Sequence, residues 1–400
     1  GGKEVSGTYD VVVIGGGMSG LMAAISLADR GRGVAVISRG DPVCCLSTGC
    51  IDVFSGGEDP IRGIESLPEN HPYRLIGVDR VEKSFDIFQK IMGEAGFPYV
   101  GDIHLNRKIL TPFGTDKTTC LVPRTMELAD CDPNEYIHVV SFKGIKDFYP
   151  SYITSGHVNS GYSIFDAGVS STSAIAERFE ERDFLQDFVS WLTNLSLPDG
   201  KIAFPAVLGT RSSMFIFNEI SDRLERDIFE IPTIPPSIPG ERLFSRLKNI
   251  FMEKGGSLYW GKEIASVERL DGQIEAVTLS KRGRSTRVQG KLFILATGSF
   301  VSGGLYASMD DVKETVFDLP AYLPGERKNW FNEDFFIPGH TIEKAGIRVD
   351  STLRPLDSEF SNLFVCGSIL AFTEVMKYGC GHGTAIATGV AAANMCEELL

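Results

Sequence analysis

The stretch "YDVVVIGGGMSGLMAAISLADRGRGVAVISRG", residues 9–40, contains the pattern on which the fold depends. The apolar, β-branched run at 11–14 predicts a strand that is buried on both faces. Gly15, Gly17 and Gly20 follow it with the spacing G-x-G-x-x-G, at the start of a predicted helix. The first glycine permits a sharp turn, the second lets a pyrophosphate approach the backbone, and the third lets helix and strand pack closely. This unit therefore predicts a nucleotide site at the start of its helix, for a dinucleotide or a flavin.

The second strand of the unit ends without the acidic residue that usually holds an adenosine ribose. Ser38 ends the strand, and Arg39 follows it. A serine hydroxyl makes single hydrogen bonds, whereas a carboxylate accepts from two hydroxyl groups at once. Arg39 could instead bind a terminal phosphate. We therefore expect the site to take FMN, with FAD as the alternative.

A further strand of the same sheet is predicted far along the chain, in "KLFILATGSFVSGG" at 291–304. Its expected cofactor contacts are Ala296, Thr297 and Gly298. Residues 255–280, which precede it, alternate apolar and polar positions and contain the turn Asp271-Gly272. This segment predicts a small antiparallel meander.

The C-terminal segment, residues 362–400, predicts a strand, a glycine-rich loop and a helix of small residues. The start of this helix offers a second set of backbone N–H groups to a cofactor. The expected contacts are Gly367, Ser368, Gly381, His382 and Gly383.

Composition narrows the class of protein. A chain of 400 residues exceeds the usual size of one core, so two lobes are expected. The net charge of −13 argues against nucleic-acid binding, which needs a basic face. Eight cysteines with no secretory signal indicate a reducing cytoplasm. No apolar run reaches the roughly 18 residues of a membrane-spanning helix, so any membrane association is expected through a partner.

Cys44, Cys45 and Cys50 lie within seven positions of one another. An iron–sulfur cluster usually needs four thiolates, and no fourth cysteine lies nearby. A redox pair would favour the spacing C-x-x-C over adjacent cysteines. We therefore expect no metal ligand here and interpret the three as small residues that line a cofactor.

The order of these elements resembles the two-dinucleotide-binding-domain flavoproteins, which include the flavoprotein subunits of fumarate reductase and succinate dehydrogenase. The resemblance implies an α/β, Rossmann-like FAD/NAD(P)-binding fold with a parallel sheet, a small antiparallel meander and an inserted α+β substrate or cap domain. It also places Ser47, Thr48 and Gly49 along the flavin ring. Val43 stands where covalent relatives carry their flavin-linking histidine, which implies a non-covalent flavin.

Within that group the chain is similar to the B-subunit family of anaerobic glycerol-3-phosphate dehydrogenases. The similarity is carried by seven phrases: "STGCIDVFSG" (47–56), "HPYRLIG" (71–77), "LTPFGT" (110–115), "FPAVLG" (204–209), "IPTIPPSIPGERL" (231–243), "ATGSFVSGGL" (296–305) and "TLRPL" (352–356). It implies oxidation of sn-glycerol 3-phosphate to dihydroxyacetone phosphate, with FMN in this chain. It also implies two partners. One is a catalytic FAD subunit, and the other is an iron–sulfur subunit that passes electrons to menaquinone. The complex would lie at the cytoplasmic face of the cell membrane.

Two other functions stay open. The chain could be a self-sufficient flavin-dependent reductase or dehydrogenase of another small acid. It could also be a non-catalytic assembly subunit that has lost its flavin, although the glycines around the expected site argue against this. Whether the substrate touches this chain or its partner is left open as well.

The expected domain order interrupts the flavin-binding domain twice. The divisions are 1–73 (flavin-binding, first part), 74–239 (inserted substrate or cap domain), 240–309 (flavin-binding, with the meander), 310–344 (lid or partner-facing insertion) and 345–400 (flavin-binding, C-terminal part). Inside the first insertion, 81–96 and 174–195 have helical apolar spacing, whereas the proline-rich 228–240 predicts an extended crossover.

Catalysis of alcohol oxidation needs a base for the hydroxyl proton and cationic groups for a substrate phosphate. His382, Arg354 and Arg242 are the candidates. The alternative for both arginines is that they brace the interface of the lobes. For His382 it is contact with the flavin or a loop carbonyl.

Overall fold

The computed structural model describes residues 4–129, 132, 134–281, 284–309, 311–334 and 336–400. The chain forms two compact units. Unit 1 consists of Gly1–Val43, Asp52–Phe88 and Leu247–Leu400, and unit 2 of Cys44–Ile51 and Gln89–Arg246.

The central sheet of unit 1 is parallel over most of its width, as the sequence predicts. Its strands are β1 (Glu4–Ile14), β2 (Val34–Ser38), β11 (Ser257–Trp260), β14 (Arg284–Leu295) and β19 (Leu363–Val365). They lie in the order β11-β2-β1-β14, and β19 pairs with the carboxyl end of β14. Val11, Val12 and Val13 are completely buried, because helices cover both faces of a parallel sheet.

The meander continues this sheet with two antiparallel strands, β12 (Glu263–Leu270) and β13 (Gln273–Lys281), the second of which pairs with β14. The turn between them has positive φ at Asp271 (49°) and Gly272 (72°), as a tight hairpin requires. One detail of the prediction was wrong. β11 lies beside β2 in parallel and is not part of the meander. The long helix α9 (Ile238–Glu253) directly precedes β11, and a helical connection of this kind allows β11 to lie parallel to β2.

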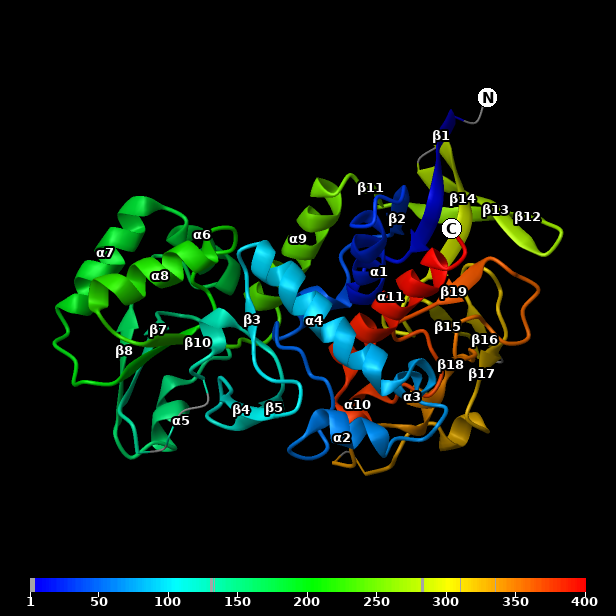
Figure 1. The fold of residues 1–400 in the computed structure, drawn as a ribbon. Coiled ribbons are helices and arrows are strands. Elements are labelled where there is room, and N and C mark those ends of the chain that lie inside the picture. Colours follow the sequence, from blue (N-terminus) through cyan, green and yellow to red (C-terminus); the bar gives the residue numbers. More distant parts are fainter. Residues whose placement is uncertain (1–3, 130–131, 133, 282–283, 310, 335) are drawn as a thin grey trace. The chain divides into compact units, whose positions relative to one another are not determined.

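Two helices of small residues lie side by side on the sheet, α1 (Met18–Ala28) and α11 (Gly381–Glu397) (Figure 1). Every residue of α1 is buried. A β-carbon on Gly389 of α11 would lie 2.4 Å from the carbonyl oxygen of Ser19 in α1. The close approach of the two helices therefore needs glycine at this position.

The remaining elements of unit 1 are short. The helices are α2 (Pro60–Glu65), α3 (Pro72–Ile76) and α10 (Val375–Tyr378), and α4 (Val78–Glu94) runs on into unit 2. The expected lid segment, 310–344, contributes to two antiparallel pairs: β15 (Leu305–Ala307) with β16 (Val312–Glu314), and β17 (Ala321–Tyr322) with β18 (Gly346–Ile347). Residues 310 and 335 of that segment lie outside the described residues.

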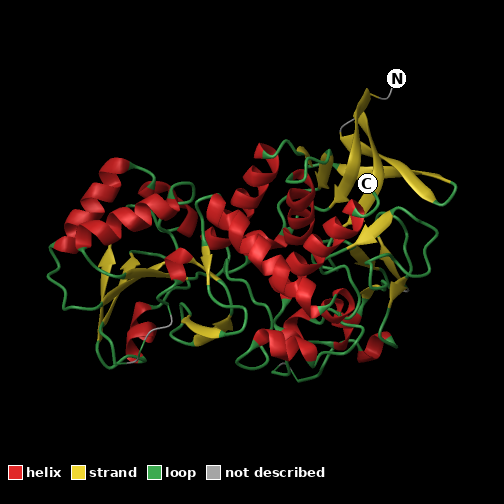
Figure 2. Ribbon diagram, in the orientation of Figure 1, coloured by secondary structure: helices red, strands yellow, loops and turns green. Residues whose placement is uncertain are grey.

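Unit 2 is built on a second parallel sheet, with strands in the order β10-β9-β7-β8. Figure 2 shows the strands of the chain in yellow and its helices in red. The strands of this sheet are β7 (Ile137–Phe142), β8 (Ser160–Phe165), β9 (Lys201–Pro205) and β10 (Ile228–Ile231), and the helices of unit 2 are α5 (Pro150–Ser155), α6 (Thr172–Phe179), α7 (Arg182–Thr193) and α8 (Ser213–Leu224). Helices connect each strand to the next, and parallel strands require such connections. This unit is therefore α/β, where the sequence predicted α+β.

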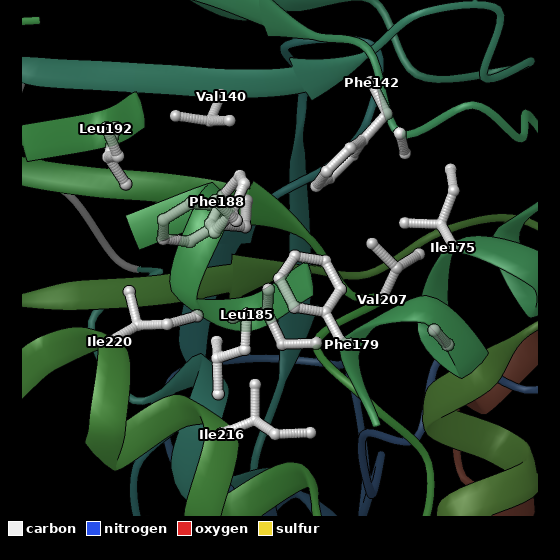
Figure 3. Close-up of a cluster of buried hydrophobic side chains, with 14 of the residues drawn as sticks. Val140, Phe142, Ile175, Phe179, Leu185, Phe188, Leu192, Val207, Ile216 and Ile220 are labelled. Carbon is white, nitrogen blue, oxygen red and sulfur yellow. The ribbon is translucent and has the colours of Figure 1, made fainter. Parts of the chain in front are cut away.

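Small antiparallel pairs accompany this sheet: β3 (Tyr99–Val100) with β6 (Val122–Pro123), and β4 (Arg107–Leu110) with β5 (Asp116–Thr119). The core between the sheet and its helices combines aliphatic side chains with several phenylalanines (Figure 3). The rings of Phe179 and Phe188 meet edge to face with centroids 5.0 Å apart, and Phe142 lies 5.8 Å from Phe179. Such pairs stabilise a core beyond the area that they bury.

The boundaries between the units differ from the expected 74 and 239. The long segment of unit 2 begins at Gln89. Residues 74–88 were assigned to the insertion, but they belong to unit 1, where α3 packs against α11. Unit 2 also takes Cys44–Ile51, which the sequence had placed in the flavin-binding domain. These residues pair and pack with later parts of unit 2: Ile51 bridges to Leu121, and the Ser237 hydroxyl donates to the carbonyl of Ser47.

Candidate functional site

The glycine motif forms the turn from β1 into α1. Gly15 has φ of 118°, and a β-carbon there would lie 2.1 Å from the carbonyl oxygen of Ala296. A β-carbon on Gly20 would lie 1.9 Å from the carbonyl oxygen of Gly15. Both glycines are therefore needed for backbone packing. Gly15 also brings Ala296, at the end of β14, against the turn.

Gly17 differs from its two neighbours in the motif. A β-carbon there would have Pro42 Cβ, 3.8 Å away, as its nearest neighbour among the described atoms. Gly17 is also the N-cap of α1, no described side chain caps this helix, and its first turn has no acidic residue. The helix thus presents uncapped backbone N–H groups to an open space, an arrangement that suits an anionic phosphate.

Ser38 and Arg39 lie at the carboxyl end of β2, beside this turn. The Ser38 hydroxyl donates to the carbonyl of Gly40 at 2.9 Å, and Ser38 pairs with Trp260 of β11. A β-carbon on Gly16 would lie 2.9 Å from Ser38 Cβ and 2.8 Å from the Trp260 ring. Arg39 Nη2 donates to the carbonyl of Ser302 at 2.8 Å. Both residues are thus at the edge of the sheet where nucleotides bind in this architecture.

The ends of β14 and β19 complete that edge. Thr297 has a buried Oγ1 with no hydrogen-bond partner among the described residues. Gly298 has φ of 75°, and a β-carbon there would lie 3.5 Å from the Ser368 hydroxyl. Gly367 has φ of 82°, and its β-carbon would lie 2.3 Å from the Ser19 hydroxyl in α1. The structure therefore gathers these residues from three segments around the start of α1.

The start of α11 is a second helix end without a side-chain cap, although the Gly383 N–H donates to the carbonyl of Asp52 at 3.1 Å. Cys380 is its N-cap, and no described side chain caps the helix. A β-carbon on Gly381 would have its nearest neighbour at 4.0 Å, and His382 follows half-buried. Gly383 has another role, because a β-carbon there would lie 2.2 Å from the Tyr73 hydroxyl. Gly383 therefore allows α11 to pack against α3. The sequence had predicted a cofactor contact for this glycine instead.

Ser47, Thr48 and Gly49 lie in unit 2, in a turn held by its own side chains. Gly49 N donates to the Ser47 hydroxyl at 3.2 Å, and the Tyr99 hydroxyl donates to the carbonyl of Gly49 at 2.6 Å. Gly49 has φ of 77°, and a β-carbon there would lie 2.6 Å from Pro239 Cβ. The contact of these three residues with a flavin ring stays a proposal.

The cysteines beside this turn belong to packed structure. Cys50 is 2% exposed and sits in an apolar cluster of unit 2, with its Sγ 3.9 Å from the sulfur of Met126. A hydrogen bond to Cys45 and burial both raise the pKa of the Cys44 thiol, so Cys44 is a neutral thiol near pH 7. The interpretation that Cys50 lines a cofactor is therefore wrong. Within the described residues, no cluster of His, Cys, Asp and Glu is arranged to hold a metal ion.

Within unit 1 the structure separates two of the catalytic candidates, Arg354 and His382. Arg354 Nη1 donates to the carbonyl of Ser361 at 3.1 Å, and its guanidinium lies 5.3 Å from the ring centre of Phe364. Ser361 precedes β19, so Arg354 lies at the amino end of that strand, whereas His382 follows the loop at its carboxyl end. Arg354 therefore lies at the other end of the strand from His382, where its contacts suit a structural role, and its catalytic role stays a prediction.

Arg242 is a structural residue of unit 2. Its side chain is 1% exposed and forms a bidentate ion pair with Glu230. Nη1 donates to Oε2 at 2.6 Å, and Nη2 donates to Oε1 at 3.0 Å. Its Nε donates to the carbonyl of Gly209 at 2.8 Å. The cation is enclosed among residues of unit 2, which agrees with a structural role inside that unit and not with contact to a substrate. Of the three candidates, only His382 lies at a helix end that suits a cofactor.

The residues of unit 1 fit a flavin nucleotide. Gly17 and Gly381 each leave room where a side chain would stand, and each opens a helix that no described side chain caps. The unpartnered Oγ1 of Thr297 adds a polar atom at the same sheet edge.

None of the helices in the described part of the chain has the length and apolar character to cross a membrane.

The chain belongs to the FAD binding domain family of flavoproteins, whose model matches residues 10–182 and 188–384. This confirms the class expected from the glycine motif. The chain is similar to the probable B subunit of the anaerobic glycerol-3-phosphate dehydrogenase of Halobacterium salinarum, with 28% identity over 98% of each protein. It is also similar to the B subunit of the anaerobic glycerol-3-phosphate dehydrogenase of Aliivibrio fischeri, with 27% identity over 98% of this chain and 96% of that protein.

Among solved structures, the chain is similar to the open conformation of a flavocytochrome c3 fumarate reductase. The TM-score is 0.45 and the identity 9%, and the match covers 99% of this chain and 79% of that one.

Sequence reasoning missed two residues of this region, His71 and Trp260. His71 is buried and holds the loop before α11, and Trp260 packs beside Ser38 at the turn. For His71 a signal was present, because Pro72 directly after it is typical of the first position of a helix. Trp260 had no such signal, since its neighbours come from a parallel pairing across the chain.

Proposed function

We propose that this chain is the B subunit, a flavoprotein, of an anaerobic glycerol-3-phosphate dehydrogenase and takes part in oxidation of sn-glycerol 3-phosphate to dihydroxyacetone phosphate. The observation that supports it most is the uncapped, open start of α1 at Gly17, in a chain whose relatives carry that name over nearly their whole length. A bound flavin would supply a two-electron acceptor for the alcohol. The backbone at Gly17 and Gly381 would hold the cofactor, with Thr297 as a polar contact.

His382 is the residue of this chain that we propose near the flavin. It stands one position inside α11, where the N–H groups of the helix favour negative charge. A neutral imidazole there can donate to a flavin oxygen or a loop carbonyl. We propose that the main oxidation step takes place on a partner, since Arg242 and Arg354, the two candidates for a substrate phosphate, are engaged elsewhere.

We propose that the partners are a catalytic FAD subunit, and an iron–sulfur subunit, which passes electrons to menaquinone. The relatives are named as one lettered subunit of an enzyme, which supports a complex of several chains. In this proposal the chain lies at the cytoplasmic face of the cell membrane and reaches it through a partner.

The proposal predicts how the flavin is reduced. When glycerol 3-phosphate is added without oxygen to the isolated, flavin-loaded chain, its visible flavin band should stay, and addition of the two partner subunits should bleach it. The measurement is absorbance near 450 nm before and after the partners are added, with glycerol as the control substrate. Full bleaching of the isolated chain would favour the self-sufficient dehydrogenase. A chain that binds no flavin would favour the assembly subunit.

We further propose FMN as the flavin, because Ser38 replaces the carboxylate that would hold an adenosine ribose. Ser38→Glu should raise affinity for FAD relative to FMN by about ten- to a hundredfold, since charge-assisted hydrogen bonds contribute about 1.5–3 kcal/mol each. The measurement is titration of the flavin-free protein with both flavins, together with chromatography of the flavin that acid releases from the native protein. Ser38→Ala is the control and should leave the ratio near that of the native chain. Recovery of FAD alone, or a ratio that Ser38→Glu does not change, would reject this account.

A further inference from the structure

One buried histidine, His71, contacts the backbone of the loop between β19 and α11. His71 is 1% exposed and comes from a distant part of unit 1, just before α3. Its Nδ1 accepts the backbone N–H of Tyr73 at 3.1 Å, and its Nε2 lies 3.2 Å from the carbonyl oxygen of Thr373. Because Nδ1 is an acceptor, Nε2 carries the proton and donates to Thr373.

This histidine is in its neutral form. Burial lowers its pKa to about 4, so near pH 7 the ring has one donor and one acceptor, and each has a partner. Protonation would place a second N–H against the N–H of Tyr73. The neutral ring is therefore the form that fits both neighbours.

The loop that His71 contacts has an unusual backbone. Phe372, Glu374 and Gly379 all have left-handed φ, at 65°, 41° and 53°. For residues other than glycine such a conformation costs free energy and persists where surrounding contacts impose it. The contact to Thr373 falls between the first two of these residues, so His71 is placed to impose it.

The same ring also touches the end of the loop. Its centroid lies 5.6 Å from the Tyr378 ring in an edge-to-face arrangement, and Nε2 is 4.0 Å from Cys380 Sγ. Cys380 is the N-cap of α11, and Gly381 and His382 follow it directly. A single side chain thus connects α3 with the strained loop and with the first residues of α11.

We propose that His71 is a positioning residue for the flavin: its Nε2–H bond to Thr373 sets the start of α11, where Gly381 and His382 would meet the cofactor. The inference rests on the proposed flavin site at this helix end. His71 does not touch the flavin in this proposal, and it acts through the loop.

Two variants separate the two hydrogen bonds of His71. In His71→Asn the amide oxygen can still cap the N–H of Tyr73, but the shorter side chain does not reach Thr373. In His71→Gln the amide N–H can reach Thr373. The Asn variant should bind flavin about three- to tenfold more weakly than the native chain, as loss of one net hydrogen bond implies, and the Gln variant should stay near the native value.

The readouts are the dissociation constant of flavin from the flavin-free protein, and the visible spectrum and reduction potential of the bound flavin. The Asn variant should shift the spectrum or potential, and the Gln variant should restore it. If the two variants weaken binding equally, or the folded Asn variant binds flavin as the native chain does, His71 is only a structural residue and the proposal is overturned.

A third variant tests the site itself. In Gly381→Val the β-carbon would make only an ordinary van der Waals contact, with Val375 Cβ at 4.0 Å, so the variant should exclude the flavin while the protein stays folded by circular dichroism. Full flavin occupancy in Gly381→Val would show that α11 does not meet the cofactor, and would overturn the site as well as the inference. Loss of flavin in Gly381→Val with no difference between the two His71 variants would overturn the inference alone.

Discussion

Gly17→Val is expected to abolish stable flavin binding and to leave the fold intact. The fold should tolerate the change, because the nearest atom to a β-carbon at Gly17 is 3.8 Å away and the residue has φ of −81°, which valine can adopt. The valine side chain would fill the space where a phosphate approaches the N–H groups of α1. Each lost charge-assisted hydrogen bond weakens binding by about ten- to a hundredfold. The measurement is flavin content after purification and titration of the flavin-free protein.

Gly93→Val is the matched control. Gly93 lies exposed in α4, and no atom lies within 4 Å of the position that its β-carbon would take. This variant should keep both its fold and its full flavin content. If Gly17→Val also keeps full flavin content, the assignment of the nucleotide site to α1 is wrong.

Arg242→Met is expected to destabilise the protein by about 3–5 kcal/mol, because it leaves the buried carboxylate of Glu230 without its cation. The Glu230 side chain is 0% exposed, and besides Arg242 it accepts the N–H of Leu208 at 2.9 Å. A lone N–H does not compensate a buried charge. The measurement is the free energy of unfolding from urea titration, followed by the fluorescence of Trp191 and the other tryptophans.

Two controls accompany this variant. Arg246→Met, one turn further along α9, removes a half-exposed arginine that donates to the carbonyl of Arg211, and should cost less than about 1 kcal/mol. In Glu230→Gln/Arg242→Met the glutamine amide can still accept from Leu208 without a charge, so part of the lost stability should return. If Arg242→Met behaves like Arg246→Met, Arg242 does not stabilise unit 2 and its role must be sought elsewhere.

Local pattern was enough where neighbours in sequence are neighbours in space. The β1–α1–β2 unit, the uncapped start of α1 at Gly17 and the Asp271-Gly272 turn could all be predicted, because each depends on residues within a short stretch. The same holds for Ser38 at the end of β2. The glycine spacing by itself indicated a nucleotide, and the family confirms a flavoprotein.

The catalytic candidates were less predictable, since an arginine in a sequence does not reveal its partner. Arg242 lies twelve positions from Glu230 with a proline-rich crossover between them, and only folding brings the two together. Arg354 was expected beside the substrate, but the direction of β19 places it at the amino end of the strand. Both outcomes depend on strand order and direction, which residue type does not encode.

The sequence by itself determined a nucleotide-binding class and the helix end proposed for the nucleotide, because turn geometry and buried strands are local properties of the chain. Only the tertiary structure decided that Cys44–Ile51 belongs to unit 2, since its contacts with Leu121 and Ser237 lie far along the chain. It also decided the partner of His71, whose hydrogen bond to Thr373 spans 302 positions. Pairings at such distances follow from how whole elements pack, and no spacing in the sequence records them.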